Sequence, residues 1–332
     1  MTTYYLYGTV LTGQAVAANN RGDNIGNTTT LQKVFVNDDL HTSVSAEAIR
    51  FAIRYRFQLQ GLNPNRTYDA VRGKLEFADE KRATWSAETG GAIDDDIMGF
   101  MDAAAAEQER EDEESPQGET ADSQPRGKGK VKAKAKAKGT VTKRPSPLAI
   151  GRAVSLRPYR GELSFNCVSG EKEKGALSLY NAEMHTTEYQ YSFGLNLGDV
   201  AAKHRIGEVV DAIVDPPQVA GNHARFSYDF SPQTIVFRVS SAHSSRIQNC
   251  FEHDEASRGI SLKKLIEKVE AGDIPANELI VGGALVKSSD GEILKKLKVT
   301  TFAGVLSAAA EARTRISNLG QDYKAVAPKK AE

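Results

Sequence analysis

The chain has 332 residues, of which 40% are hydrophobic, and its 43 basic and 43 acidic residues cancel, so it can form a sizeable core in one or two domains. No apolar run approaches the roughly 20 residues that cross a membrane, and Met1 to Val10 lacks the layout of a signal peptide. We therefore expect no membrane partner. Cys167 and Cys250 form no metal-binding cluster, so we expect no zinc site and no other cofactor, and two cysteines without such a cluster suit the reducing cytoplasm.

The first predicted elements are a buried strand, from Thr3 to Leu11, and a helix that begins after Ser45. The Ser45 hydroxyl can accept a first-turn backbone N–H, and Glu47 suits the positive end of a helix. Four apolar residues recur at helical spacing and would face a core: Ile49, Ala52, Ile53 and Phe57.

Basic and hydroxyl side chains gather around the start of that helix. Arg50 and Arg54 are four residues apart and share one helix face. Lys33 and the Ser43 and Ser45 hydroxyls lie just upstream. Together with the free backbone N–H groups of the helix start, they predict an anion site that suits a polyphosphate chain. The alternative is that the two arginines only solvate the outer face of the helix.

The middle of the chain contains two segments without a clear assignment. Thr67 to Phe77 could form a helix or a strand. Asp94, Asp95 and Asp96 would suit a metal ion, but the sequence provides no obvious partner ligands. We therefore expect these three aspartates in a solvated turn or at the start of a helix.

A low-complexity segment follows, from about residue 103 to residue 143. Nine acidic residues between Asp102 and Asp122 precede nine basic residues between Arg126 and Arg144. Because large apolar residues are almost absent, we expect a disordered loop. An alternative compatible with disorder is a tethered basic arm that follows nucleic-acid phosphates.

Later segments have clearer patterns. Apolar residues alternate with other types from Tyr189 to Leu197, which predicts a strand with one apolar face. Gly221, Asn222 and Arg225 combine close backbone approach, an amide and a cation, which suits a sugar-phosphate backbone, although a simple turn is the alternative. We also predict a strand over Thr234–Val239 and three helices, over Val200–Asp215, Ser261–Ala271 and Phe302–Asn318.

Four motifs resemble one known family. They are G-T-V-L-T at residues 8–12, G-N-x-T-x-L-x-K at 26–33, H-x-x-x-S-x-x-A-I-R-x-A-I-R at 41–54, and A-G-N-x-x-R-x-x-Y-D-F-x-P at 220–232. The D-D-D-x-x-G-F-M string at 94–101 adds a fifth match. Together they resemble the backbone subunit of Cascade-type CRISPR surveillance complexes: the Cas-seven superfamily, in its DevR branch of the type I-B kind. Ala220 replaces the first glycine of the last motif, a small departure.

The resemblance implies an α+β fold built on a ferredoxin-like, RNA-recognition-motif-type antiparallel sheet. Residues 1–65 and 145–332 would form this palm, with a thumb hairpin near 166–187, and residues 66–144 would form a fingers-like insertion. In the family the thumb reaches across the RNA groove of a neighbouring subunit and displaces a nucleotide from the stack. Tyr180 and Met184 are candidates for the apolar wedge that displaces the nucleotide, although either could be an ordinary core residue. Lys172 and Lys174 could bind phosphate, or they could lie at a solvated tip.

The resemblance also implies a function in antiviral defence. The chain would be a non-catalytic subunit that polymerises side by side on a CRISPR guide RNA, holds its backbone and leaves bases free to pair with target DNA. Its partners would be the guide RNA, target DNA, copies of itself and other Cascade subunits. The implied RNA-binding residues are Lys33, His41, Ser43, Ser45, Arg50, Arg54, Gly221, Asn222 and Arg225.

Two functions of other kinds stay open. The six histidines, with Asp23, Asp38 and Asp39 in the early loops, would suit a ribonuclease that cleaves target RNA or processes guides. None of the histidines lies in a known catalytic motif, and no phosphate-binding glycine loop is present. The third function is that of a stand-alone single-strand RNA-binding protein.

Overall fold

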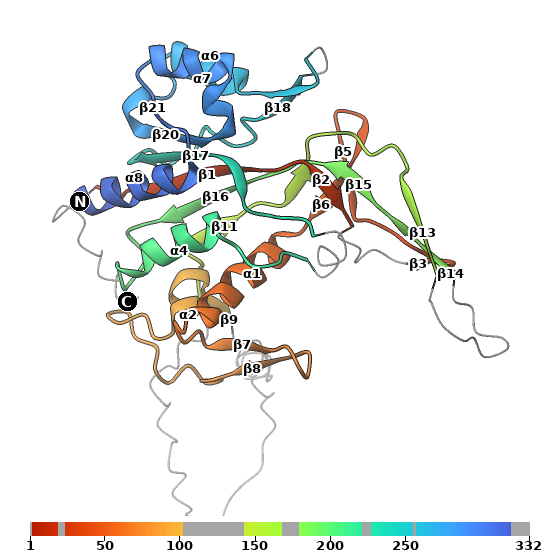
Figure 1. Cartoon of the computed structure of the whole chain (residues 1–332). Coiled ribbons are helices and arrows are strands. Elements are labelled where there is room, and N and C mark those ends of the chain that lie inside the picture. Colours follow the sequence, from red (N-terminus) through yellow and green to blue (C-terminus); the bar gives the residue numbers. More distant parts are fainter. Residues whose placement is uncertain are drawn as a thin grey trace, which may run out of the picture.

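A large, mainly antiparallel sheet forms the centre of the fold (Figure 1). The computed structural model describes residues 2–18, 24–101, 143–167, 179–220, 227–254 and 257–319. The pair β20–β21 is parallel, and the other pairs of this sheet are antiparallel. In sheet order the strands are β21 (Thr300–Phe302), β20 (Leu279–Gly283), β17 (Pro232–Ser240), β1 (Tyr5–Thr12), β16 (Tyr189–Asn196), β12 (Ala153–Ser155), β6 (Asp39–Val44) and β5 (Lys33–Val36), and β11 (Leu148–Ile150) also pairs with β16. The predicted α+β class is confirmed.

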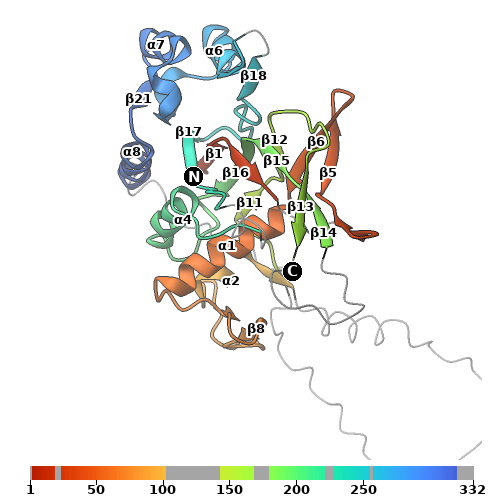
Figure 2. The same cartoon turned by 45° about the vertical axis from the view of Figure 1, so that its right-hand side comes forward.

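Helices cover both faces of this sheet, so its central strands are apolar on both sides. On β1, Leu6 and Val10 join one core cluster, whereas Tyr7 and Leu11 join a second. Helices α1 (Ala46–Leu59), α4 (Arg205–Val214) and α8 (Val305–Asn318) contribute to the first cluster, and α6 (Lys263–Glu270) and α7 (Ser289–Lys296) to the second. Figures 1 and 2 show α6 and α7 on the opposite side of the sheet from α1 and α4. Burial on both faces explains why β1 reads as a nearly continuous apolar run.

Most of the predicted elements are confirmed. The four apolar residues predicted to face the core from α1 are buried, and the apolar side of β16 is buried as well. Helices α6 and α8 lie within their predicted ranges. Helix α4 begins at Arg205 rather than Val200, and the backbone N–H groups of Ala201 and Ala202, just before the helix, donate to the Asp96 carboxylate.

The ambiguous segment 67–77 is an antiparallel hairpin. It consists of β7 (Arg66–Asp69) and β8 (Lys74–Phe77), and Gly73 in its turn has φ of +63°. Glycine adopts this left-handed conformation without steric cost, which favours the tight reversal. The hairpin packs against α1 at one end of the molecule (Figure 1).

A four-stranded sheet projects from the body at another end (Figures 1 and 2). We call it the projecting sheet; its strands in order are β13 (Leu163–Cys167), β14 (Leu179–Glu183), β4 (Thr28–Thr29) and β3 (Asn24–Ile25). The remaining elements are short: β2 (Ala15–Ala17) with β15 (His185–Thr187), β9 (Phe100–Met101) with β10 (Lys143–Arg144), β18 (Glu252–Asp254) with β19 (Gly259–Ser261), α2 (Ile93–Met98), η1 (Ala276–Glu278) and η2 (Ala284–Lys287).

Two finer expectations about the fold stay predictions: the ferredoxin-like arrangement of the core and the division into palm, fingers and thumb. Among the residues that the structure describes, no helix is both long and apolar enough to cross a membrane.

Candidate nucleic-acid interface

The start of α1 is built as the sequence predicts. Strand β6 ends at Val44, and the Ser45 hydroxyl then accepts a hydrogen bond from the backbone N–H of Ala48 at 3.2 Å. Glu47 occupies the first turn. The predicted cap at Ser45 is therefore confirmed, and it fixes the positive end of α1 at the edge formed by β6 and β12.

Arg50 and Arg54 lie against other parts of the protein rather than on an open face. The Arg50 guanidinium donates to the carbonyl oxygens of Leu148 at 2.9 Å and Met98 at 2.7 Å. The Arg54 Nε donates to a carboxylate oxygen of Asp94 at 3.1 Å, and the Arg54 side chain is only 13% exposed. Burial lowers the pKa of both guanidiniums. These contacts join α1 to α2 and to the start of β11; binding of RNA by either arginine stays a prediction.

The other early residues of the predicted site are also held by the fold. Lys33 forms an ion pair with Glu183 of the projecting sheet, and its ammonium lies 4.9 Å from the centre of the Tyr159 ring. His41 is buried, with 2.7 Å between its Nδ1 and the carbonyl oxygen of Ser155. Each side chain therefore has an internal partner that the sequence pattern did not reveal.

One exposed cation lies beside the predicted site and was missed. Arg152 donates to the Ser43 hydroxyl at 3.2 Å and to the Gln32 side-chain oxygen at 3.3 Å. It comes directly before β12, where Ala153 pairs with Val44 at the end of β6. That register places Arg152 beside the residues leading into α1. A lone arginine at a strand start gave no signal in the sequence, since the pairing of β12 with β6 was not predicted.

The second half of the predicted site lies outside the described residues: Gly221, Asn222 and Arg225. The described part of that motif, from residue 227 onward, is held by hydrogen bonds of Tyr228. The Tyr228 hydroxyl lies 2.7 Å from the Thr12 hydroxyl and donates to the Gly13 carbonyl oxygen at 3.1 Å. The motif therefore leads back to the end of β1 in the central sheet.

The candidate thumb residues are only partly described. Lys172 and Lys174 lie outside the described residues, and Tyr180 can be placed only by its backbone, in β14. Met184 is half-buried, and its backbone N–H donates to the Glu162 carbonyl oxygen at 3.1 Å. The wedge role of Tyr180 and Met184 stays a prediction.

The triple aspartate differs from the expected solvated turn. All three carboxylates lie on α2 and are buried. Asp96 alone binds the guanidiniums of Arg144 at 2.8 Å and Arg205 at 3.0 Å, together with two backbone N–H groups. The expected helix start is correct, but the solvation is wrong, because arginines from distant parts of the chain converge here. No group of three metal-binding side chains occurs within the described residues.

Asp94 and Asp95 extend this cluster. Asp94 accepts from the backbone N–H groups of Asn65 at 2.6 Å and Arg66 at 3.1 Å, in addition to Arg54. Burial and the neighbouring Asp94 charge raise the pKa of Asp95, which forms an ion pair with Arg82 at 3.6 Å. The D-D-D string therefore joins α1, α4 and the segment inserted after α1.

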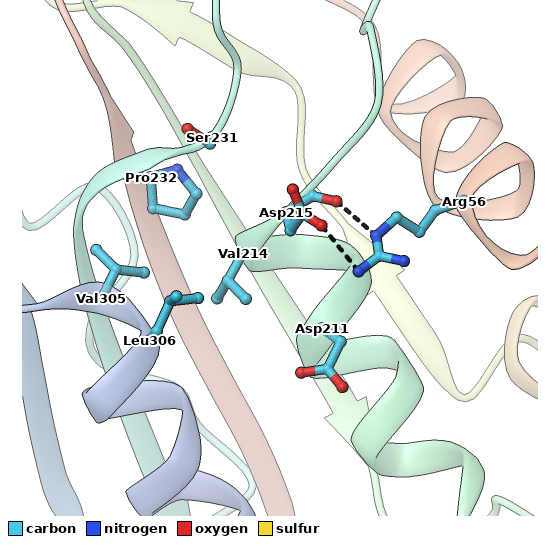
Figure 3. A pocket seen from close by; sticks show the side chains of 8 residues that line it. All are labelled: Arg56, Asp211, Val214, Asp215, Ser231, Pro232, Val305 and Leu306. Atoms are coloured by element: carbon cyan, nitrogen blue, oxygen red, sulfur yellow. Dashed lines mark hydrogen bonds and ion pairs between the residues drawn. The ribbon is translucent and has the colours of Figure 1, made fainter. Parts of the chain in front are cut away.

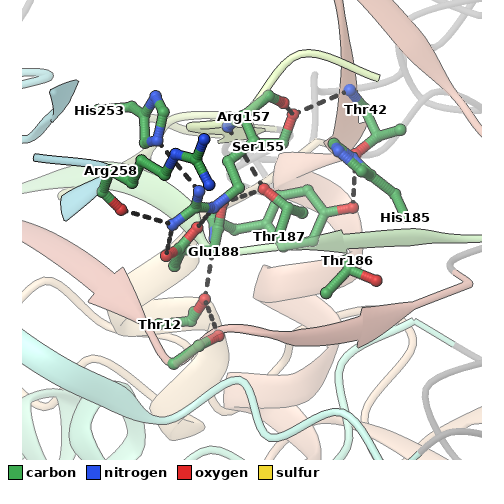
Figure 4. A network of polar contacts seen from close by, with 12 residues as sticks. Thr12, Thr42, Ser155, Arg157, His185, Thr186, Thr187, Glu188, His253 and Arg258 are labelled. Carbon is green, nitrogen blue, oxygen red and sulfur yellow. Dashed lines mark hydrogen bonds and ion pairs between the residues drawn. The ribbon is translucent and has the colours of Figure 1, made fainter. Parts of the chain in front are cut away.

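A second polar cluster lies where β16 meets β18 and β19 (Figure 4). Arg157 donates to both oxygens of buried Glu188, at 2.8 and 2.9 Å, and lies 3.0 Å from the Nε2 of His253. Nearby, 2.8 Å separates the Nδ1 of His185 from the Thr42 hydroxyl, and burial lowers the pKa of His185 to about 4. His41 and His185 are both buried and hydrogen-bonded within the protein, so neither presents an accessible imidazole for ribonuclease chemistry.

A surface pocket of about 420 Å³ lies between α1, α4, α8 and the start of β17 (Figure 3). Its lining consists of Arg56, Asp211, Val214, Asp215, Ser231, Pro232, Val305 and Leu306. Arg56 pairs with Asp215 at 2.9 Å, and Asp211 pairs with Arg313 of α8. Because its charges are neutralised in pairs, this pocket indicates no particular ligand.

Comparison with known proteins identifies the family. Residues 10–261 of the chain match the family described as "CRISPR-associated negative auto-regulator DevR/Csa2". The chain belongs to the DevR/Csa2 family. This DevR/Csa2 protein is 36% identical, over 324 residues, to a Myxococcus xanthus (strain DK1622) protein named "CRISPR-associated protein Cas7/Cst2/DevR"; the match covers 94% of the chain and 97% of the relative.

Solved structures share the fold of this DevR/Csa2 protein. One, titled "CRISPR RNA-guided surveillance complex, pre-nicking", contains a chain that matches with a TM-score of 0.56 at 12% identity, covering 95% of this chain and 100% of the other. Another, titled "CRISPR RNA-guided surveillance complex", matches with a TM-score of 0.50 at 12% identity, covering 93% and 99%. At such identities the likeness shows the fold alone.

Proposed function

We propose that the chain is a non-catalytic backbone subunit of an RNA-guided CRISPR surveillance complex. Several copies would lie side by side along a guide RNA in the cytoplasm, hold its sugar-phosphate backbone and leave its bases free to pair with target DNA. Other subunits of the complex would complete the assembly. The observation that carries the proposal is membership of the DevR/Csa2 family, with 36% identity to a protein named "CRISPR-associated protein Cas7/Cst2/DevR". The fold shared with a chain of an RNA-guided surveillance complex supports it.

The RNA contacts would lie at the edge where β6 enters α1. Arg152 supplies an exposed cation there, and Ser43 and Gln32 supply polar groups next to it. The predicted residues Lys33, Ser45, Arg50 and Arg54 would act at the same edge, the last two chiefly by holding α1 in place. Gly221, Asn222 and Arg225 would contact sugar or phosphate, and the thumb residues would act on a neighbouring copy.

The direct test is to purify the protein from cells that carry its CRISPR array and to sequence the RNA that accompanies it. We expect guide RNAs protected from nuclease at regular intervals. Heterogeneous cellular RNA without such spacing would instead favour a stand-alone RNA-binding protein. Magnesium-dependent cleavage of a complementary RNA, lost in Asp38→Ala, would overturn the non-catalytic assignment in favour of a ribonuclease; Asp38 lies in the turn between β5 and β6.

Arg152 provides a residue-level test of the proposed edge. Because one lost phosphate contact releases one counterion fewer, Arg152→Ala should reduce the slope of log K against log salt by about 0.7 to 1. The matched control is Arg246→Ala, which removes an arginine 47% exposed and paired with Asp273 near α6. Titrations of guide RNA at several salt concentrations give both slopes. Equal slopes for Arg152→Ala and the unmodified protein would remove Arg152 from the interface.

A further inference from the structure

Lys33 and Glu183 form an ion pair at the base of the projecting sheet. Lys33 begins β5 and Glu183 ends β14, so the pair joins the central sheet to the projecting sheet. Their side chains are 20% and 14% exposed, so each keeps an edge that solvent or a ligand can reach. The pair is therefore partly shielded, but it is not sealed within the core.

Glu183 has another partner that does not depend on Lys33. The carboxylate oxygen that binds the Lys33 ammonium also accepts the backbone N–H of Leu31 at 2.7 Å. The Tyr159 ring lies beside both charges. Burial raises the pKa of Tyr159 and the Glu183 charge adds to this effect, while the Lys33 ammonium lies 4.9 Å from the ring centre. Departure of the lysine would therefore leave the Glu183 carboxylate hydrogen-bonded rather than isolated.

Lys33 also begins the strand that borders the proposed RNA-binding edge. Its partner across the β5–β6 pair is Thr42, the residue before Ser43. The Ser43 hydroxyl accepts from Arg152, the exposed cation of that edge. A lysine ammonium is a compact charge on a flexible stem, and it binds carboxylate and phosphate oxygens equally well as a point charge. A phosphate held at this edge would therefore compete with Glu183 for the same ammonium.

We propose that the Lys33 ammonium exchanges between Glu183 and a phosphate of the guide RNA, and that Glu183 is the positioning residue that controls this exchange. Without RNA, Glu183 holds the ammonium beside the Tyr159 ring. With RNA, the phosphate takes the ammonium, and the Glu183 carboxylate keeps the Leu31 N–H. This inference rests on the proposed function, because it concerns one of the contacts by which the guide would be held. It ties that contact to the base of the projecting sheet.

The exchange predicts an unusual dependence of RNA binding on salt. An ordinary phosphate contact releases a counterion from the RNA, so the affinity falls as salt rises. At Lys33 the phosphate instead displaces Glu183, and the uncovered carboxylate attracts a cation from solution in return. Lys33→Ala should therefore weaken guide binding with little change in the slope of log K against log salt. This result would differ from that expected for Arg152→Ala, which lowers the slope.

The test is a double-mutant cycle in the full-length protein, with Lys33→Ala, Glu183→Gln and both together titrated with guide RNA at several salt concentrations. Glutamine keeps an acceptor for the Leu31 N–H but has no charge to hold the lysine. Glu183→Gln should strengthen binding about three- to tenfold at low salt and steepen the slope by about 0.7. The steepening should disappear when Lys33→Ala is added. The matched control Glu252→Gln removes a carboxylate paired with Lys264 of α6, and it should change neither quantity.

Three outcomes would overturn the inference while leaving the proposed function standing. Unchanged or weaker binding by Glu183→Gln, at an unchanged melting temperature, would show that the pair only fastens the projecting sheet. An equal change of slope with and without Lys33 would show a general effect of charge. A slope lower by about 0.7 in Lys33→Ala alone would show a phosphate contact without exchange, and this measurement decides the question if Glu183→Gln folds poorly. Absence of guide RNA from the unmodified protein would overturn the proposed function itself.

Discussion

A guanidinium that suits a phosphate also suits a buried carboxylate, and at Arg54 the structure uses the second partner. The Arg54 side chain is 13% exposed and the Asp94 side chain is 3% exposed, so their ion pair is almost fully buried. Removing one member of such a pair leaves the other charge buried without its partner. The helix-face pattern of Arg50 and Arg54 is the same in either case, so sequence alone could not separate the two roles.

Arg54→Ala should therefore destabilise the protein by about 3 kcal/mol. Two backbone N–H groups still reach Asp94 in the variant, which limits the loss. The control Arg72→Ala removes a 63% exposed arginine paired with Asp69, and it should change the free energy of unfolding by less than about 1 kcal/mol. Urea denaturation measures both. Similar losses in the two variants would show that the Arg54 pair has no special structural role.

His185 should make stability depend on pH. Burial lowers its pKa from the ordinary 6.5 to about 4 in the folded protein, so between these values the unfolded chain binds a proton that the folded chain does not. The contribution of His185 to the free energy of unfolding is therefore complete above about pH 6.5. Up to about 3 kcal/mol of it is lost as the pH falls towards 4. His185→Gln should flatten this dependence in urea denaturation from pH 4 to 7. His204→Gln, at an exposed histidine, should leave it unchanged, and an unaltered slope in His185→Gln would contradict the assignment.

At the scale of elements, the low-complexity segment enters and leaves the fold at one point. Met101 of β9 pairs with Lys143 of β10, and Arg144 is anchored to Asp96 with its guanidinium 4.3 Å from the centre of the Trp85 ring. Replacing residues 103–142 by a short glycine-rich turn should therefore leave the melting temperature nearly unchanged. It should weaken only the non-specific, salt-sensitive binding of RNA, because it removes a basic run.

A matched deletion separates the two halves of that segment. Removing only the acidic half, residues 103–122, should strengthen non-specific binding, since the nearby carboxylates no longer compete with phosphate for the basic run. Gel-shift assays at two salt concentrations give the comparison. Unfolding of the first variant would show that the segment belongs to the core.

Patterns among neighbouring residues predicted the helices and strands, whereas contacts between residues far apart in the sequence could not be predicted from such patterns. The Ser45 cap, the apolar side of α1 and the alternation in β16 depend on neighbours within a few residues, and the structure confirms them. Asp96 is different, because its partners Arg144 and Arg205 are 48 and 109 residues away. Arg152 was missed for the same reason: only the register of β12 against β6 brings it to the start of α1.

At the scale of the whole molecule, a backbone subunit and a stand-alone RNA-binding protein differ in how bound mass grows with RNA length. Copies that meet through fixed surfaces occupy a fixed number of nucleotides each, so mass should rise in steps of one 36.0 kDa chain. Independent binding would give a broad distribution at every length. Single-particle mass measurements on guides lengthened a few nucleotides at a time provide the test.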